Sequence, residues 1–258
     1  MRLQKIAVFL LMGILLLMLS SPVNALVIKN LEFNVDGVLP STEPDIELFN
    51  NTGQPETLLY SVSGGLLMQR TFNVNGNASY NWPEDTLTPG TLNSAMDISM
   101  EARLQVLQIE GSAGAFFQAF DGNNRYSAFF QSTGVDLPTT TGSVTIPVNV
   151  LQFHTYRLES PGNSNALNFF IDDVLKFSGS APAQNVNGFN WGDGVTGAGN
   201  GADADWDFVR VSQTSPIPEP TTISLLGIGL FGFGANYLRR ARKRFQITAL
   251  RRQRTHKV

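Results

Sequence analysis

Apolar and polar residues alternate most regularly in the middle of the chain, between Ile98 and Val106. Successive side chains of a β-strand point to opposite faces of a sheet, so strict alternation indicates a strand with one buried and one wet face. The face predicted to be buried carries Ile98, Met100, Ala102, Leu104 and Val106. The segment is therefore expected in a sheet that covers a hydrophobic core with one of its faces.

Segments of the same period, separated by turn residues, fill residues 26–215. The predicted strands are 26–33, 45–49, 57–62, 66–74, 98–106, 114–120, 126–131, 143–151, 154–159, 166–171, 174–177 and 206–211. Turns rich in Gly, Asn and Asp, typical of β-hairpins, join three pairs of them at 63–65, 121–124 and 172–173. Residues 81–95, with two prolines and a glycine, are predicted to be a loop. No helix of ten residues is expected here, so the pattern predicts an all-β protein, an antiparallel β-sandwich.

The N-terminal segment, residues 1–25, has a different pattern. Arg2 and Lys5 precede an apolar run from Ile6 to Leu19, and Val23-Asn24-Ala25 has the small residues of a cleavage site. The run is too short to span a membrane comfortably, which favours a signal peptide over the alternative, an uncleaved anchor. Signal peptidase is expected to cut between Ala25 and Leu26.

A second apolar run, from Thr221 to Leu238, contains 18 residues and no charge. As a helix rising about 1.5 Å per residue it would cover roughly 27 Å, close to the thickness of a bilayer's hydrocarbon core. A transmembrane helix is therefore predicted over 221–238. The basic cluster after it is expected to stay cytoplasmic together with the basic tail 245–258. The cluster consists of Arg239, Arg240, Arg242, Lys243 and Arg244.

A short tripeptide, Pro218-Glu219-Pro220, precedes the second apolar run. With the predicted span and the arginine-rich end, it makes residues 216–244 resemble the PEP-CTERM sorting signal of bacterial exported proteins. The resemblance implies processing by an exosortase-type enzyme at or near Pro218-Glu219-Pro220. It also implies a protein anchored in the membrane before processing and found afterwards at the cell surface or in the extracellular matrix, in bacteria that make exopolysaccharide or biofilm.

The charge of −3 conceals an acidic body between the two ends. Residues 26–215 hold seven of the 18 Lys and Arg but 20 of the 21 Asp and Glu, a net charge of −13. Such a surface argues against nucleic acid as a partner, because phosphate binding needs clustered cations. The chain has no cysteine, and the body has one histidine, His154. Thiolate metal sites and disulfides are therefore excluded, and calcium (Ca²⁺) is the type of cation that this composition favours.

Three segments of the body resemble a known fold. These are His154–Leu158, the Asn168–Leu175 segment around Asp172-Asp173, and Trp206–Val211. They are similar to strands of the concanavalin A-like lectin/glucanase domain in its laminin-G-like form, and the resemblance implies a jelly-roll β-sandwich.

Hydrolases of that superfamily carry two or three carboxylates close together on one strand, which places acid and nucleophile on one face. This sequence has no Glu-x-Asp-x-x-Glu pattern. Its nearest substitutes are Asp97 with Glu101, and the series Asp203, Asp205 and Asp207. No catalytic residue is therefore predicted, and the protein is not expected to be an enzyme.

The glycine-rich segment 188–205 is predicted to be a long loop. It holds Trp191, Asp193, Asp203 and Asp205. Three interpretations stay open: a solvated acidic loop, a cation site formed by Asp193, Asp203 and Asp205, or a ligand site with Trp191 as a flat platform.

Two functions are consistent with these features. The first is a non-catalytic exported protein of the envelope or matrix, a β-sandwich module that is sorted through its C-terminal signal and binds polysaccharide. The alternative is a secreted glycan hydrolase or lyase on the same scaffold. The two differ in whether a pair of carboxylates converges on one sheet.

Overall fold

The computed structural model of the chain describes residues 26–82, 92–109, 112–194 and 201–214. These belong to the first of two compact units, Met1–Pro216 and Ile217–Val258. The predicted signal peptide, the helix 221–238, the basic cluster and the tail 245–258 lie outside the described residues. Among the residues that are described, no helix is long and apolar enough to cross a membrane.

Fifteen strands and two short helices make up the described body. The helices are η1 (Pro40–Thr42) and α2 (Glu56–Leu59). The strands are β1 (Leu26–Glu32), β2 (Glu47–Asn50), β3 (Tyr60–Ser63), β4 (Leu66–Arg70), β5 (Ala78–Trp82), β6 (Asp97–Ile109), β7 (Ser112–Asp121), β8 (Arg125–Gln131), β9 (Gly134–Thr139), β10 (Gly142–Pro147), β11 (His154–Ser160), β12 (Ala166–Ile171), β13 (Val174–Ser180), β14 (Asn187–Asp193) and β15 (Ala202–Thr214).

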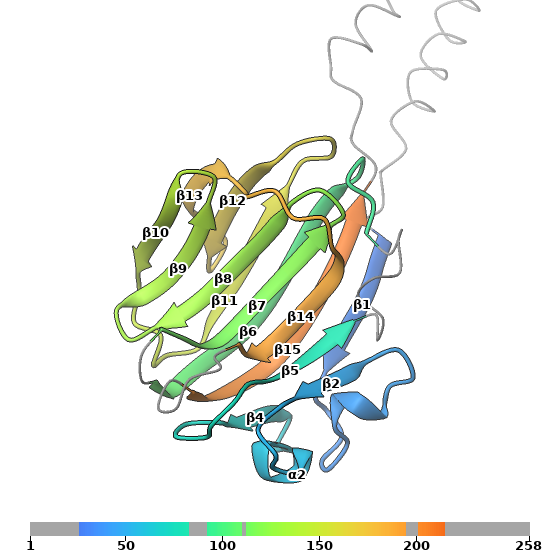
Figure 1. Ribbon diagram of the computed structural model, residues 1–258, viewed down its shortest axis with the longest axis vertical. Coiled ribbons are helices and arrows are strands. Elements are labelled where there is room, and N and C mark those ends of the chain that lie inside the picture. Colours follow the sequence, from blue (N-terminus) through green and yellow to red (C-terminus); the bar gives the residue numbers. More distant parts are fainter. Residues whose placement is uncertain (1–25, 83–91, 110–111, 195–200, 215–258) are drawn as a thin grey trace, which may run out of the picture. The chain divides into compact units, whose positions relative to one another are not determined.

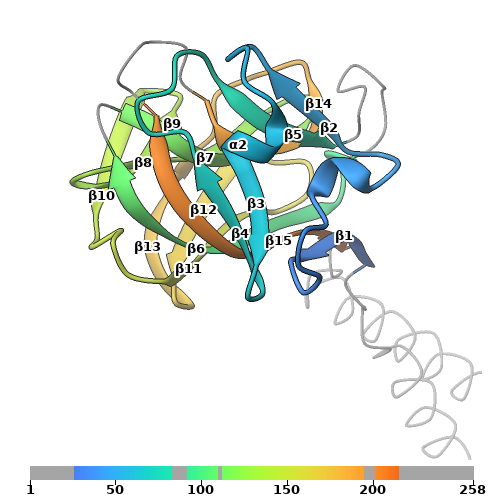
Figure 2. The same ribbon diagram turned by 90° about the horizontal axis from the view of Figure 1, so that it is seen from below.

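The strands form two antiparallel sheets that pack face to face (Figures 1 and 2). Sheet A has eight strands in the order β13-β12-β11-β6-β15-β4-β3, with β1 also pairing with β15. Sheet B has seven strands in the order β10-β9-β8-β7-β14-β5-β2. The predicted antiparallel β-sandwich is thus confirmed.

The core lies between the two sheets and is built from the inward side chains of both. The five apolar residues of β6 predicted to point inward are at most 4% exposed, which confirms that prediction. Aromatic side chains from the facing sheets meet there, as where Phe130 of β8 packs edge-on against Tyr156 of β11 with 4.8 Å between ring centroids. Because one face of each sheet is closed by the other sheet, the sheet faces open to solvent among the described residues are the outer ones.

The predicted hairpin turns are present. Gly64 and Gly65 connect β3 and β4 with φ of 61° and 79°, and Asp172 and Asp173 connect β12 and β13 with φ of 49° and 63°. A two-residue turn with positive φ at both positions matches the right-handed twist of the flanking strands. Aspartate tolerates this conformation better than most residues.

The side chain of Asp172 ties its turn to the neighbouring strand β11. One oxygen accepts the backbone N–H of Thr155 at 3.0 Å, and the other lies 2.6 Å from Nδ1 of His154. Partial burial acts to raise the pKa of Asp172, but these contacts with His154 and Thr155 outweigh it and hold the pKa below its usual 3.8.

We expect this carboxylate to stabilise the protein in a pH-dependent way. A lowered folded-state pKa means that the stabilisation is complete above the unfolded value of 3.8 and is lost as the pH falls through the lower folded value. Asp172→Asn should therefore melt below the wild type at neutral pH, and the difference should shrink on acidification below pH 3.8. Thermal melts of both proteins across this range test it. A difference that does not depend on pH would contradict the assignment.

Three strands were not predicted, namely β5, β9 and β14. The segment 81–95 was expected to be a loop, but β5 continues through Trp82. The segment 188–205 was also expected to be a loop, whereas β14 and β15 occupy most of it. The loop prediction for 188–205 is therefore wrong, and its residues must be judged by their places in two sheets.

Candidate functional site

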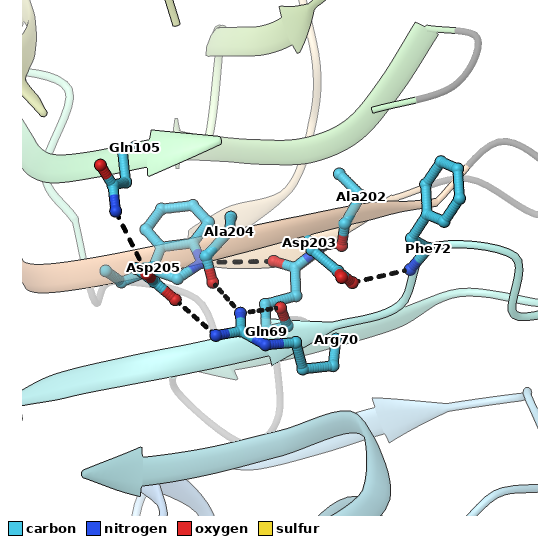
Figure 3. Close-up of polar contacts among 9 residues, drawn as sticks. Gln69, Arg70, Phe72, Gln105, Ala202, Asp203, Ala204 and Asp205 are labelled. Carbon is cyan, nitrogen blue, oxygen red and sulfur yellow. Dashed lines mark hydrogen bonds and ion pairs between the residues drawn. The ribbon is translucent and has the colours of Figure 1, made fainter. Parts of the chain in front are cut away.

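The aspartates predicted to bind a cation lie on two sheets. Asp203 and Asp205 are on β15 of sheet A (Figure 3). Asp205 accepts from the Arg70 guanidinium at 2.8 Å and from the Gln105 amide at 3.2 Å, so its charge is already balanced. Asp203 accepts the backbone N–H of Phe72 at 3.2 Å. Both carboxylates bind the protein itself.

Asp193 is on β14 of sheet B and is fully buried. Across the described ranges, no group of three His, Cys, Asp or Glu side chains is placed to hold a metal ion. The structure therefore does not bring Asp193, Asp203 and Asp205 together as a calcium site. Asp203 and Asp205 instead tie β15 to β4, to β6 and to the segment directly after β4.

We expect Asp205→Ala to lower the free energy of unfolding by about 1–3 kcal/mol, because Arg70 and Gln105 would lose their acceptor in a partly shielded place. The side chain of Asp205 is 11% exposed and that of Arg70 is 34% exposed. Chelator should leave the melting temperature of the wild type unchanged. Calorimetry with calcium and with chelator checks this, and a higher melting temperature in calcium would restore the cation interpretation.

Trp191 was predicted to offer a platform to a ligand, and this prediction is wrong. Its side chain on β14 is fully buried in the core. The ring lies between Tyr80 and Phe189, with centroids 5.3 Å from each. The inward side of β14 is packed against sheet A, so no ligand reaches this ring in the folded body.

The acids considered as substitutes for a catalytic pair are also engaged in sheet A. Glu101 lies 3.5 Å from Arg210, and Asp97 accepts the backbone N–H of Gly162 at 2.7 Å. Asp207 pairs with Arg103. These contacts cross-link strands and loops of sheet A.

A different surface, the outer face of sheet B, carries an ordered set of polar side chains. The strand registers align four of them across β8, β7, β14 and β5. We call this set the amide row: Ser127, Gln118, Asn190 and Asn81. Neighbouring strands lie about 4.8 Å apart, so the row extends over roughly 14 Å. The Ser127 hydroxyl donates to Oε1 of Gln118 at 3.0 Å, which leaves the amide N–H groups of Gln118 for another acceptor.

Aromatic side chains flank the amide row on both sides. On one side, Phe129 of β8 stacks with Phe116 of β7, with 5.7 Å between centroids. Farther along the same row, Phe49 of β2 is 47% exposed. On the other side, Phe120 of β7 is paired in register with Arg125 of β8. Phe116 and Phe120 are only 3% and 8% exposed, so the rings open to a ligand beside the row are Phe49 and the half-buried Phe129.

This face is hollowed into a groove of about 390 Å³. The side chains around it are Phe49, Asn77, Ser79, Asn81, Phe116, Gln118, Phe120, Arg125, Phe129, Val186 and Asn190, with Gly194 at the rim. Within the described protein, three of their polar atoms are shielded from solvent and form no hydrogen bond: Oδ1 of Asn77, Oδ1 of Asn190 and Nε of Arg125. Buried polar atoms are nearly always paired in native proteins, so these three are hydrogen-bonding groups that the described protein leaves unused at the groove.

The groove suits a hydroxyl-rich ligand with apolar faces. Amides and hydroxyls bind hydroxyl groups in both directions, and phenyl rings cover the C–H faces of a sugar ring. None of the described residues that line the groove is Asp or Glu. On the same face Asp136 of β9 and Glu47 of β2 are five strands apart, about 24 Å. A glycosidase needs its two carboxyl groups about 5–10 Å apart.

Sequence reasoning missed this groove because two of its strands were not predicted: most of β14 was assigned to a loop, and most of β5 was left unassigned. One signal was present: Phe116, Gln118 and Phe120 alternate with Ala115, Phe117 and Ala119 in β7. An antiparallel strand with one solvated face normally carries polar residues there, so phenylalanines on the outer face of β7 are a departure from that pattern.

The body is similar in fold to solved concanavalin A-like β-sandwiches, as the resemblance implied. A laminarinase from Rhodothermus marinus matches with a TM-score of 0.51 and 16% identity, covering 75% of this chain and 99% of that one. A structure from work on endo-acting O-glycanases of the human gut microbiota, which initiate mucin breakdown, matches with a TM-score of 0.51 and 13% identity. The match covers 73% of this chain and 99% of that one. A sialidase matches with a TM-score of 0.53 and 8% identity, over 72% of this chain and 18% of the sialidase.

At these identities the likeness shows the fold alone. Among curated proteins, none is significantly similar in sequence to this chain. Residues 216–242 match the PEP-CTERM protein-sorting motif, which confirms the resemblance drawn from Pro218-Glu219-Pro220 with its apolar and basic segments. The motif marks an exported protein that a C-terminal hydrophobic region anchors at the membrane before an exosortase-type enzyme releases it to the cell surface.

Proposed function

We propose that the protein is a non-catalytic β-sandwich module of the bacterial envelope or extracellular matrix that binds polysaccharide in the groove of sheet B. The observation that carries this proposal is the amide row between phenylalanines, with shielded polar atoms that no described protein group satisfies. Export and sorting through the C-terminal motif would bring the groove to a surface rich in exopolysaccharide.

A glycan hydrolase or lyase on the same scaffold is the alternative function. Hydrolysis needs an acid and a nucleophile or base on either side of the scissile bond. The described lining of the groove supplies amides, hydroxyls, phenyl rings and one guanidinium. This composition favours binding over cleavage.

The proposal is tested on the full chain, purified in detergent from an export-competent bacterial host, with a glycan array. We expect the wild type to bind polysaccharide and the double variant Gln118→Ala with Asn190→Ala to lose at least tenfold in affinity. Loss of two or three hydrogen bonds at roughly 0.5–1.5 kcal/mol each accounts for that factor. Asn168→Ala serves as the matched control, since Asn168 of β12 lines a hollow on the other sheet.

Two results would contradict the proposal. An array on which wild type and double variant bind equally would remove the groove as the site. Release of reducing ends from a bound polysaccharide by the wild type would replace the binding module with the hydrolase.

A further inference from the structure

Arg125 is unusual among the cations of the body. Five of the seven Lys and Arg in residues 26–215 form ion pairs with carboxylates. The other two, Arg125 and Lys176, have no carboxylate within ion-pair distance among the described residues. Lys176 is exposed on the edge strand β13, where water solvates an ammonium group. Arg125 lines the groove of sheet B.

The position of Arg125 is fixed by its strand. Its backbone N–H donates to the carbonyl of Pro182 at 2.9 Å, and its register partner is Phe120. Its Nε is shielded from solvent and is unpaired within the described protein. In a body with a net charge of −13 that pairs its other arginines, a partly shielded guanidinium without a carboxylate marks a place for an anion from outside.

We propose that the groove takes an acidic glycan and that Arg125 binds the carboxylate of a uronic acid. This proposal rests on the proposed function, because it specifies the class of polysaccharide for the same groove. The planar fork of arginine donates two parallel hydrogen bonds to a carboxylate, and because Nε of Arg125 is shielded, the terminal Nη groups are the donors here. The amide row and the accessible rings of Phe49 and Phe129 then contact the neutral sugars beside the uronic acid.

The charge of the body sets a limit on this glycan. A densely charged polymer would be repelled by the net −13, whereas a single carboxylate at Arg125 gains a short-range contact. The groove otherwise offers neutral groups. The ligand is therefore a heteropolysaccharide in which uronic acids are separated by neutral sugars, as opposed to a continuous polyuronate.

The experiment uses the full chain in detergent and three probes. The probes are gellan, in which glucuronate is spaced by neutral sugars, the same polysaccharide with its carboxyl groups reduced to alcohols, and polygalacturonate. The proteins are the wild type, Arg125→Gln, Arg125→Lys and the control Lys176→Gln, which changes the net charge by the same amount outside the groove. Circular dichroism melts establish that each variant is folded.

We expect the wild type to bind native gellan at least tenfold more tightly than the reduced form, and more tightly than polygalacturonate. Arg125→Gln should bind native and reduced gellan equally, at the affinity of wild type for the reduced form. Arg125→Lys should keep part of the preference, and Lys176→Gln all of it.

The failures of the two proposals are distinguishable. Equal binding of native and reduced gellan by the wild type would overturn the uronate assignment and leave polysaccharide binding intact. A preference that survives in Arg125→Gln would overturn the role of Arg125. Absence of binding to these probes and to every glycan of the array would overturn the proposed function itself, and the uronate assignment with it.

Discussion

Leu104→Asp is expected to unfold the body at room temperature. Leu104 is fully buried at the centre of β6, which lies between β11 and β15 in sheet A. Truncating a buried leucine costs about 2–5 kcal/mol, and burying an unpaired carboxylate adds several more. Small domains are stable by only about 5–15 kcal/mol, so the sum removes most or all of the stability. Far-ultraviolet circular dichroism with thermal denaturation measures the effect.

The matched control is Leu107→Asp on the same strand. Leu107 is 45% exposed and lies where the register between β6 and β15 shifts, so a carboxylate there stays hydrated. We expect its melting temperature to lie within a few degrees of the wild type. Equal melting temperatures for Leu104→Asp and the wild type would show that this face of β6 is not core.

Replacing Pro218-Glu219-Pro220 with three alanines should abolish release of the protein from the membrane. The apolar run from Thr221 to Leu238 is unchanged by the substitution, so anchoring is expected to persist while the processing enzyme loses its recognition sequence. Immunoblots of membrane and culture supernatant from an exosortase-bearing host measure it. The expected result is nearly all wild-type protein released and nearly all variant retained.

Pro216→Ala is the control for this substitution, because it removes a neighbouring proline and leaves the tripeptide in place. Its release should match that of the wild type. If the triple-alanine variant were released as well as the wild type, the C-terminal segment would act as a plain anchor, and release would have to come from another protease.

The parts of the fold that the sequence predicts are those that depend on local physics. The alternation in β6 predicts its buried face because strand geometry alone sends successive side chains to opposite sides. The turns at Gly64-Gly65 and Asp172-Asp173 are predictable because few residues adopt positive φ at two successive positions.

The strands that were not predicted contain residues whose presence is explained by contacts with distant parts of the chain. In β14, Gly188 and Gly192 gave the appearance of a loop. Gly192 has a φ of 126°, and a Cβ there would lie 2.6 Å from the Tyr60 hydroxyl and 2.9 Å from the Ala78 carbonyl, so contacts with both sheets require glycine. In β9, Pro138 has no backbone N–H and so disfavours a strand, yet it is paired with Ser143 of β10. Neither reason is visible before the chain is folded.

The groove is harder still to predict, because it forms only where strands from distant parts of the sequence lie side by side in sheet B. Ser127, Gln118, Asn190 and Asn81 become one row through three registers that join distant parts of the sequence. The sequence drew attention to Trp191, whose neighbour Asn190 faces the groove. An error of one position in a strand exchanges the core face for the binding face.

The pairing of β1 with β15 has a consequence for how the protein crosses the membrane. Leu26, the expected first residue after signal cleavage, is aligned with Gln213, and β15 also holds β6 and β4 in place. A chain threaded outward from its N-terminus therefore cannot complete sheet A until its last strand has emerged. Until then the strands already exported have unpaired edges, and such non-local pairing is slow and prone to aggregation. Folding is then completed at about the moment when the apolar segment reaches the bilayer, so that maturation and anchoring occur together.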